Sequence, residues 1–139
     1  MEVNLKFDKN MRFVGTNELG HKTFFDTHPQ SGGDDSAPTP MEVLLESMAA
    51  CSCMDIVPIL KKKKKHVEDL RVIIKGERSE IHPKVFNDIH FIFELVSPDT
   101  ELSDFEHAVE LSMTKYCSVT LMIKRSGCNV TYECKTVKS

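Results

Sequence analysis

The chain has no excess of positive charge. Its 139 residues carry a formal net charge of −3 at pH 7. General nucleic-acid binders and membrane-surface binders are normally basic, so this balance argues against both classes. The run of five lysines at 61–65 is a local exception, and no aromatic residues are interleaved with it. We interpret it as the solvated C-terminal end of a helix, with a phosphate-binding patch as the less favoured alternative.

The chain also lacks a recognisable targeting or membrane segment. Its first ten residues, MEVNLKFDKN, alternate charged and apolar residues, unlike a basic region followed by an apolar stretch. No apolar run approaches the roughly 18–20 residues that a membrane span needs. We therefore expect a cytoplasmic protein without a membrane partner.

The chain also lacks the even number of cysteines that complete pairing in disulfides would need. With five cysteines, at least one must be unpaired, and in a reducing compartment none is expected to form a permanent disulfide. Low-complexity segments and internal repeats are absent, and the composition is globular, with 40% hydrophobic and 28% charged residues. The length fits one domain, which we expect to cover residues 1–139.

The spacing of apolar residues predicts the element order βββ-α-ββ-α-α-β. Val3, Leu5 and Phe7 alternate with polar residues, which is typical of a half-buried strand. The predicted elements are a three-stranded meander in 2–26, a surface loop at 27–38, a helix at 39–60, an antiparallel hairpin of strands 67–79 and 85–96, helices at 101–114 and 118–125, and a closing strand at 129–137. Ser118 is the expected cap of the last helix.

The helix at 39–60 is the element around which the chain is organised. Thr39 is its expected N-cap, Pro40 its first residue, and Glu42 completes a capping box. Pro58 is expected to kink or end the regular hydrogen bonding. Apolar residues lie on every side of this helix, so we expect the rest of the assembly to cover it all round.

Two cysteines in this helix, Cys51 and Cys53, resemble a C-x-C metal or redox motif. Residues two apart in a helix point roughly 200° apart, so these thiols cannot share a metal or a disulfide without unwinding. A zinc site needs about four nitrogen or sulfur ligands, and the histidines have no matching spacing. We therefore expect no metal and no cofactor, and ordinary surface or strand roles for His66, His82 and His90.

Cys117 lies at an interruption between two predicted helices. A thiol at a helix N-terminus has its thiolate form favoured by unpaired N–H groups and by the helix dipole. Cys128 and Cys134 lie in or near the closing strand without a chemical neighbour, so we expect them to be structural. The spacing of the residues does not by itself pair Cys51 with Cys117.

Several motifs are spread over nearly the whole chain: Thr39-Pro40-Met41-Glu42 through Ala49-Ala50-Cys51, Lys115-Tyr116-Cys117-Ser118-Val119, Gly32-Gly33-Asp34, Gly76-Glu77-Arg78 and His82-Pro83-Lys84-Val85-Phe86. Together they resemble the OsmC/Ohr family, the osmotically induced and organic hydroperoxide resistance proteins. The resemblance is closer to the plain OsmC-like branch than to the hydroperoxide resistance branch.

The resemblance implies an α/β (α+β) fold and an intertwined homodimer. Antiparallel sheets from both chains would wrap two long central helices, with the active sites at the dimer interface. It also implies a thiol peroxidase that reduces organic hydroperoxides in oxidative or osmotic stress. Cys51 would attack the peroxide, Cys117 would resolve the sulfenic acid, and Glu42 is the candidate orienting acid; an external thiol would then reduce the disulfide.

The chain departs from the peroxidase branch of this family at two positions. That branch has a glutamate directly after the helix-opening proline, where this chain has Met41. It also has an arginine in the first hairpin, whereas residues 17–20 here contain Glu18 and no cation. An acid near a thiolate disfavours it. The alternatives are therefore a weakly reactive or non-catalytic protein that binds a small ligand, and a structural dimer with inert thiols.

Overall fold

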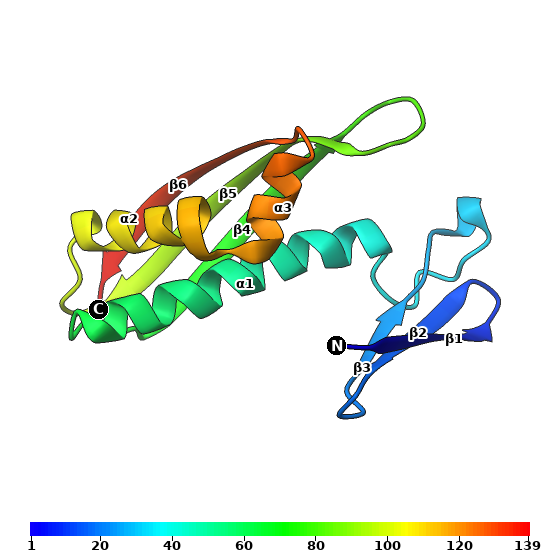
Figure 1. Cartoon of the computed structure of the whole chain (residues 1–139), viewed down its shortest axis with the longest axis horizontal. Coiled ribbons are helices and arrows are strands. Elements are labelled where there is room, and N and C mark those ends of the chain that lie inside the picture. Colours follow the sequence, from blue (N-terminus) through cyan, green and yellow to red (C-terminus); the bar gives the residue numbers. More distant parts are fainter. The chain divides into compact units, whose positions relative to one another are not determined.

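The computed structural model describes all 139 residues, which form two compact units, Met1–Leu44 and Leu45–Ser139. The helix α1, Pro40–Lys62, begins in the first unit and continues into the second (Figure 1). The single domain expected from the chain length stays a prediction.

The N-terminal unit contains a three-stranded antiparallel sheet. Its strands are β1 (Val3–Lys9), β2 (Arg12–Asn17) and β3 (Lys22–Phe25), in the order β1-β2-β3. The turn between β2 and β3 is closed by the Asn17 side chain, which accepts hydrogen bonds from the backbone N–H groups of Leu19 and His21. Asparagine is a common turn residue for this reason. The predicted meander is confirmed.

A buried carboxylate organises the loop that follows β3. Asp26 accepts hydrogen bonds from the backbone N–H groups of Thr27, Asp34 and Ser36, at 2.8, 3.3 and 3.1 Å, and from the Ser36 hydroxyl at 2.5 Å. The Ser36 hydroxyl bond, followed by the backbone bonds, lowers the pKa of Asp26 to about 2. The loop is therefore an ordered turn around one anion.

The helix α1 begins with the predicted capping box. The Glu42 carboxylate accepts hydrogen bonds from the Thr39 backbone N–H at 3.0 Å and from its hydroxyl at 2.8 Å, and the Glu42 N–H donates to Thr39 Oγ1 at 3.3 Å. Pro58 lies inside the helix and is exposed, but it does not end the helix, which continues to Lys62. A proline inside a helix costs about 3 kcal/mol, so packing elsewhere along α1 must offset it.

The C-terminal unit contains a mixed sheet with the order β4-β5-β6. Its strands are β4 (Asp69–Arg78), β5 (Phe86–Ser97) and β6 (Asn129–Lys138), and two helices, α2 (Leu102–Leu111) and α3 (Ser118–Arg125), lie between β5 and β6 in the chain. The predicted hairpin of β4 and β5 and the predicted element order are confirmed. The expectation of antiparallel sheets is wrong for β6, which runs parallel to β5. The two helices carry the chain back to the start of the sheet, as a parallel connection requires.

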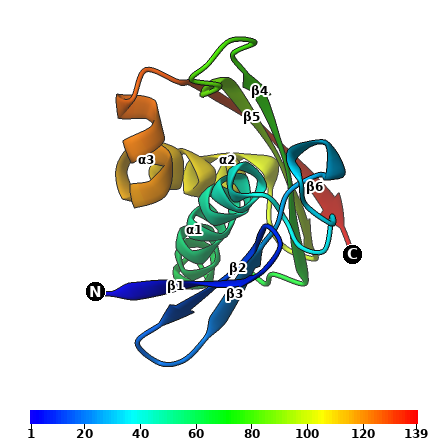
Figure 2. The ribbon, with the colours of Figure 1, turned by 90° about the vertical axis from the view of Figure 1, so that its right-hand side faces the viewer.

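All three helices lie on one face of this sheet (Figure 2). The covered face of β5 presents Ile89, Phe91, Phe93 and Leu95, all at most 1% exposed. The helix α1 has a stripe of buried residues one turn apart: Met48, Ser52, Ile56 and Leu60. Met48, Ile56 and Leu60 belong to one core cluster with the β5 residues, and the Ser52 hydroxyl points to Met113 and Cys117. Phe105, Ala108 and Val109 of α2 complete the core. This packing fixes which side of α1 faces α2 and α3.

The opposite side of α1 is not covered by the rest of the C-terminal unit. Met54 is 75% exposed, and Ala50 and Pro58 are exposed beside it. The C-terminal unit alone therefore does not meet the expectation that this helix is covered all round. By length and composition alone α1 could also cross a membrane, with a mean hydropathy of 1.7, although Glu42, Glu46 and Asp55 interrupt its apolar residues. Core helices of water-soluble proteins meet the same criterion, which makes it weak evidence for a span.

The lysine run connects the end of α1 to the start of α2. Lys63 Nζ lies 3.2 Å from the Asp104 carboxylate, and Lys65 Nζ donates to the Asp99 carbonyl at 2.9 Å. The hydrogen bond from Lys63 is the largest cause that lowers the pKa of Asp104. These two lysines therefore have partners within the fold, in agreement with a helix end.

Candidate functional site

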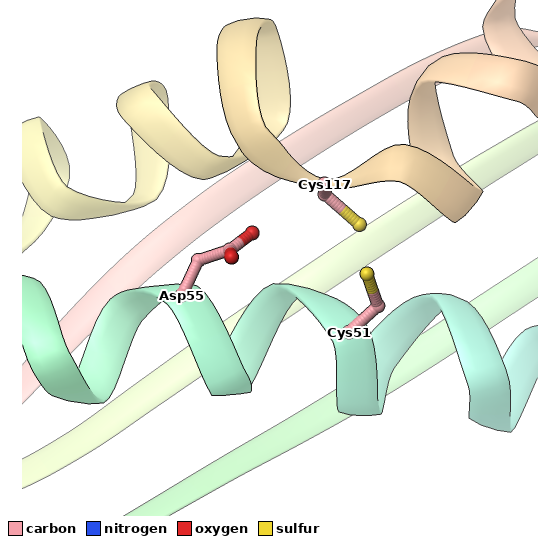
Figure 3. Close-up of side chains that lie close together, drawn as sticks. All are labelled: Cys51, Asp55 and Cys117. Atoms are coloured by element: carbon pink, nitrogen blue, oxygen red, sulfur yellow. The ribbon is translucent and has the colours of Figure 1, made fainter.

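Two of the predicted site residues meet in the C-terminal unit. Cys51 comes from α1, and Cys117 comes from the connection between α2 and α3 (Figure 3). Their Sγ atoms and a carboxylate oxygen of Asp55 all lie within 4.8 Å of one another. Asp55 is one helical turn after Cys51, so both side chains project from the same side of α1. The packing of the helices thus brings together two thiols that are far apart in the sequence.

A π-helical turn, Ser112–Tyr116, gives Cys117 its position. The Cys117 N–H donates to the Ser112 carbonyl at 2.8 Å, which closes a turn with one residue more than an α-helical turn. Ser112 Oγ donates to the Asp55 carboxylate at 3.0 Å, so the same turn also holds Asp55. The sequence pattern located an interruption here but did not predict its form.

Cys117 is the N-cap of α3. Its backbone is extended, with φ −72° and ψ 98°, and its Sγ accepts a hydrogen bond from the Thr120 N–H at 3.5 Å. The prediction that Ser118 caps this helix is wrong, because Ser118 is already the first helical residue. Ser52 Oγ donates to Cys117 Sγ at 3.4 Å, and the side chain is fully buried. The Cys117 sulfur therefore lies among hydrogen-bonding groups and has no contact with solvent.

Cys51 is only partly buried, and its surroundings disfavour the thiolate. Burial raises the pKa of Cys51 above its ordinary value, and the nearby Cys117 thiol and Asp55 carboxylate raise it further. A hydrogen bond from the Val119 backbone N–H, in the first turn of α3, acts in the opposite direction. None of the groups that shift this pKa is a lysine or an arginine.

The structure does not bring Glu42 to the thiols. Glu42 lies nine positions before Cys51 on α1, a rise of about 13.5 Å along the helix. Its carboxylate is occupied by the capping box, whose bonds to Thr39 lower the pKa of Glu42. Arg12, the arginine nearest in sequence to residues 17–20, bonds to Ser36 and Asp8 within the N-terminal unit.

The other three cysteines are separate from this cluster. Cys53 lines a shallow apolar groove on the uncovered side of α1, and burial raises its pKa. Burial also raises the pKa of Cys128, and that of Cys134 to about 12. Such thiols are poor nucleophiles at neutral pH.

Asp55 and Ser112 are the members of the site that the sequence analysis missed. The spacing Cys51-x-x-x-Asp55 was available as a signal, because residues four apart share one face of a helix. The expectation of no metal site rested on cysteine and histidine spacing alone. The set Cys51, Asp55 and Cys117 has the arrangement of a candidate metal site.

Comparison with known proteins gives concordant results over nearly the whole chain. Residues 33–133 match the family described as OsmC-like protein. The chain is 34% identical to protein YhfA of Escherichia coli K12 over 137 residues, which cover 99% of this chain and 98% of YhfA. A crystal structure of a hypothetical protein from Aquifex aeolicus VF5 is 34% identical, with a TM-score of 0.82 and coverage of 99% and 97%. A Legionella pneumophila organic hydroperoxide resistance protein shares the fold at 17% identity, with a TM-score of 0.69 and coverage of 98% and 96%.

The electrostatics of Cys51 can be tested by alkylation at a series of pH values. We expect the iodoacetamide reaction of Cys51, followed by peptide mass spectrometry, to have a midpoint above the value of about 8.5 for a free cysteine. Asp55→Asn should move the midpoint down, because it removes a negative charge beside the thiol. Asp69→Asn, at an exposed position of β4, is the matched control and should leave the midpoint unchanged. A midpoint below that of free cysteine would contradict this description.

Proposed function

The chain belongs to the OsmC-like protein family, and from this premise we propose that it is a thiol peroxidase that reduces organic hydroperoxides with Cys51 and Cys117. The observation that carries the proposal is the pair of thiols within 4.8 Å, one of them at a helix N-terminus. The name of the Legionella relative, an organic hydroperoxide resistance protein, supports the choice of substrate class. Oxidative or osmotic stress is the proposed setting, and the cytoplasm the proposed location.

The first step assigns the attack to Cys51. Cys51 is partly exposed whereas Cys117 is fully buried, so a peroxide reaches the Cys51 sulfur first. The Cys51 thiolate attacks the outer oxygen of the hydroperoxide, and the O–O bond breaks. The leaving alkoxide takes a proton and departs as the alcohol, and Cys51 becomes a sulfenic acid. The Val119 N–H is the group that stabilises the attacking thiolate.

The second step assigns resolution to Cys117. Its sulfur attacks the sulfur of the Cys51 sulfenic acid, an S–S bond forms, and the hydroxyl group leaves as water with the thiol proton. Cys117 lies between a π turn and α3, at the end of a helix and not in its interior. The two sulfur atoms, which lie within 4.8 Å of each other, must approach further to form a disulfide. The backbone between the π turn and α3 is therefore the place where the chain has to shift. An external thiol then returns both cysteines to the reduced form by exchange.

Glu42 has no step in this scheme. Within one chain its carboxylate serves the start of α1, about 13.5 Å from Cys51 along the helix. The missing cation and the raised pKa of Cys51 make the proposed enzyme slow at neutral pH. The missing cation and the raised pKa of Cys51 also favour a second candidate function, a weakly reactive protein that holds a small ligand beside Cys51.

We also propose that a second copy of the chain covers the uncovered side of α1. Ala50, Cys53, Met54, Val57 and Pro58 line a groove of about 490 Å³ there, and its lining is almost entirely apolar. Leaving Met54 three-quarters exposed forgoes part of the roughly 1.5–3 kcal/mol that burying such a side chain contributes. A homodimer through this face would bury Met54 and gain this free energy.

Thiol titration after peroxide treatment separates the two candidate functions. We expect cumene hydroperoxide to consume two thiols per chain in the reduced protein, one in Cys117→Ser and none in Cys51→Ser. Cys134→Ser is the matched control and should still lose two. Because the pKa of Cys51 is raised, the rate should rise about tenfold per pH unit between pH 6 and 8, as the thiolate fraction does. No thiol loss within minutes at pH 8 would favour the binding protein.

Sedimentation equilibrium tests the proposed homodimer. The unaltered chain should sediment as a dimer, and Met54→Glu should sediment as a monomer, because it would bury an unpaired charge at the interface. Ile73→Glu, on the outer face of β4, is the matched control and should remain dimeric. A monomeric unaltered chain at micromolar concentration would contradict the proposal.

A further inference from the structure

One member of the thiol cluster has no place in the peroxidase reaction. The Asp55 carboxylate faces both sulfur atoms within 4.8 Å. A carboxylate repels the negative charge that a thiolate carries, so it opposes the first chemical step. A cation placed between the three groups would instead be attracted by all of them once the thiols lose their protons. The position of Asp55 is thus suited to a ligand of opposite charge.

We propose that Cys51, Asp55 and Cys117 form a binding site for a divalent cation of the zinc class. Cys51 and Asp55 lie one turn apart on one side of α1, and Cys117 faces them from the start of α3 (Figure 3). Two ligands four residues apart on a helix, with a third from another element, is a common arrangement of zinc ligands. This site goes beyond the proposed peroxidase and does not depend on it.

The distances suit a small tetrahedral ion. With zinc–sulfur bonds of about 2.3 Å, two thiolates on one tetrahedral zinc lie about 3.8 Å apart. The three ligand atoms here lie within 4.8 Å of one another, so each has to move by an ångström or less to reach a common centre. Rotation of the side chains about their χ1 bonds can supply this change.

Two buried serines hydrogen-bond to the proposed ligand side chains and fix their orientation. The Ser112 hydroxyl donates to one oxygen of Asp55 at 3.0 Å and leaves the other oxygen available. Ser52 Oγ donates to Cys117 Sγ at 3.4 Å from the buried stripe of α1. Hydrogen bonds of this kind orient metal ligands and raise their affinity. Both serines are fully buried, so these bonds do not compete with solvent.

The ligand set selects the class of ion. Two thiolates disfavour magnesium and calcium, which prefer oxygen ligands, and favour zinc. Three protein ligands leave a fourth tetrahedral position for water or another small ligand, as in open zinc sites. Cys51 and Asp55 are partly buried whereas Cys117 is fully buried, so the ion and any fourth ligand enter from the side of Cys51 and Asp55.

Metal binding and oxidation would exclude each other at this site. Binding of the ion displaces one proton from each thiol and leaves no free sulfur to attack a peroxide. Conversely, a hydroperoxide that oxidises the two thiols to a disulfide yields the alcohol and water, and both sulfur ligands are lost. The ion would therefore protect the reduced pair, and oxidation would release it.

Cobalt(II) titration of the reduced protein tests the site, because tetrahedral cobalt thiolates absorb where the protein does not. We expect one cobalt per chain, thiolate-to-cobalt charge-transfer absorption in the near ultraviolet, and displacement by one equivalent of zinc. Asp55→Asn should weaken cobalt binding at least about tenfold, the low end of what even outer-shell partners cost. Cys117→Ser should abolish the charge-transfer band at stoichiometric cobalt, and Cys53→Ser should leave it unchanged.

The outcomes separate this site from the peroxidase. No charge-transfer band at stoichiometric cobalt, or a band and affinity unchanged in Asp55→Asn, would overturn the three-ligand site. If Asp55→Asn is not folded by circular dichroism, Asp55→Glu takes its place and should retain the band with altered affinity. A cobalt band in a protein that loses no thiols to peroxide would reject the peroxidase and retain the metal site. Thiol loss to peroxide without cobalt binding would do the reverse.

Discussion

The packing of one side of α1 against the β4-β5-β6 sheet is the constraint on which the site depends. Met48, Ser52, Ile56 and Leu60 lie one turn apart and are all buried, so the helix has a single orientation about its axis in this unit. That orientation turns Cys51 and Asp55 toward the connection between α2 and α3. Truncating a buried leucine or isoleucine of such a stripe to alanine typically destabilises the fold by about 2–5 kcal/mol, so this packing holds the helix firmly in its orientation.

The site then contains two opposing electrostatic influences. The start of α3 offers N–H groups to both sulfur atoms, from Val119 to Cys51 and from Thr120 to Cys117. Burial and the Asp55 carboxylate act against a thiolate at Cys51. A peroxidase needs the N–H groups, which favour the thiolate. A cation site uses these groups and the Asp55 carboxylate. Both proposals therefore follow from the same few atoms and differ in what neutralises the charge.

Much of the fold was predictable from local pattern, and the reasons are visible in the structure. Strand alternation, the Thr39–Glu42 capping box and the interruption near Cys117 are local features, and each has the predicted place. The parallel pairing of β6 and the π turn at Ser112 depend on tertiary packing, which no local window contains. The pairing of Cys51 with Cys117 came only from the family resemblance. Asp55 was missed, although its spacing from Cys51 was readable.

We propose that Cys51 and Cys117 act as one redox pair. Non-reducing peptide mass spectrometry after one equivalent of organic hydroperoxide tests this pairing most directly. We expect a single new cross-linked species that joins the Cys51 peptide to the Cys117 peptide and disappears on reduction. A Cys51 converted to sulfinic acid without that link, or a disulfide between Cys51 and any other cysteine, would contradict it.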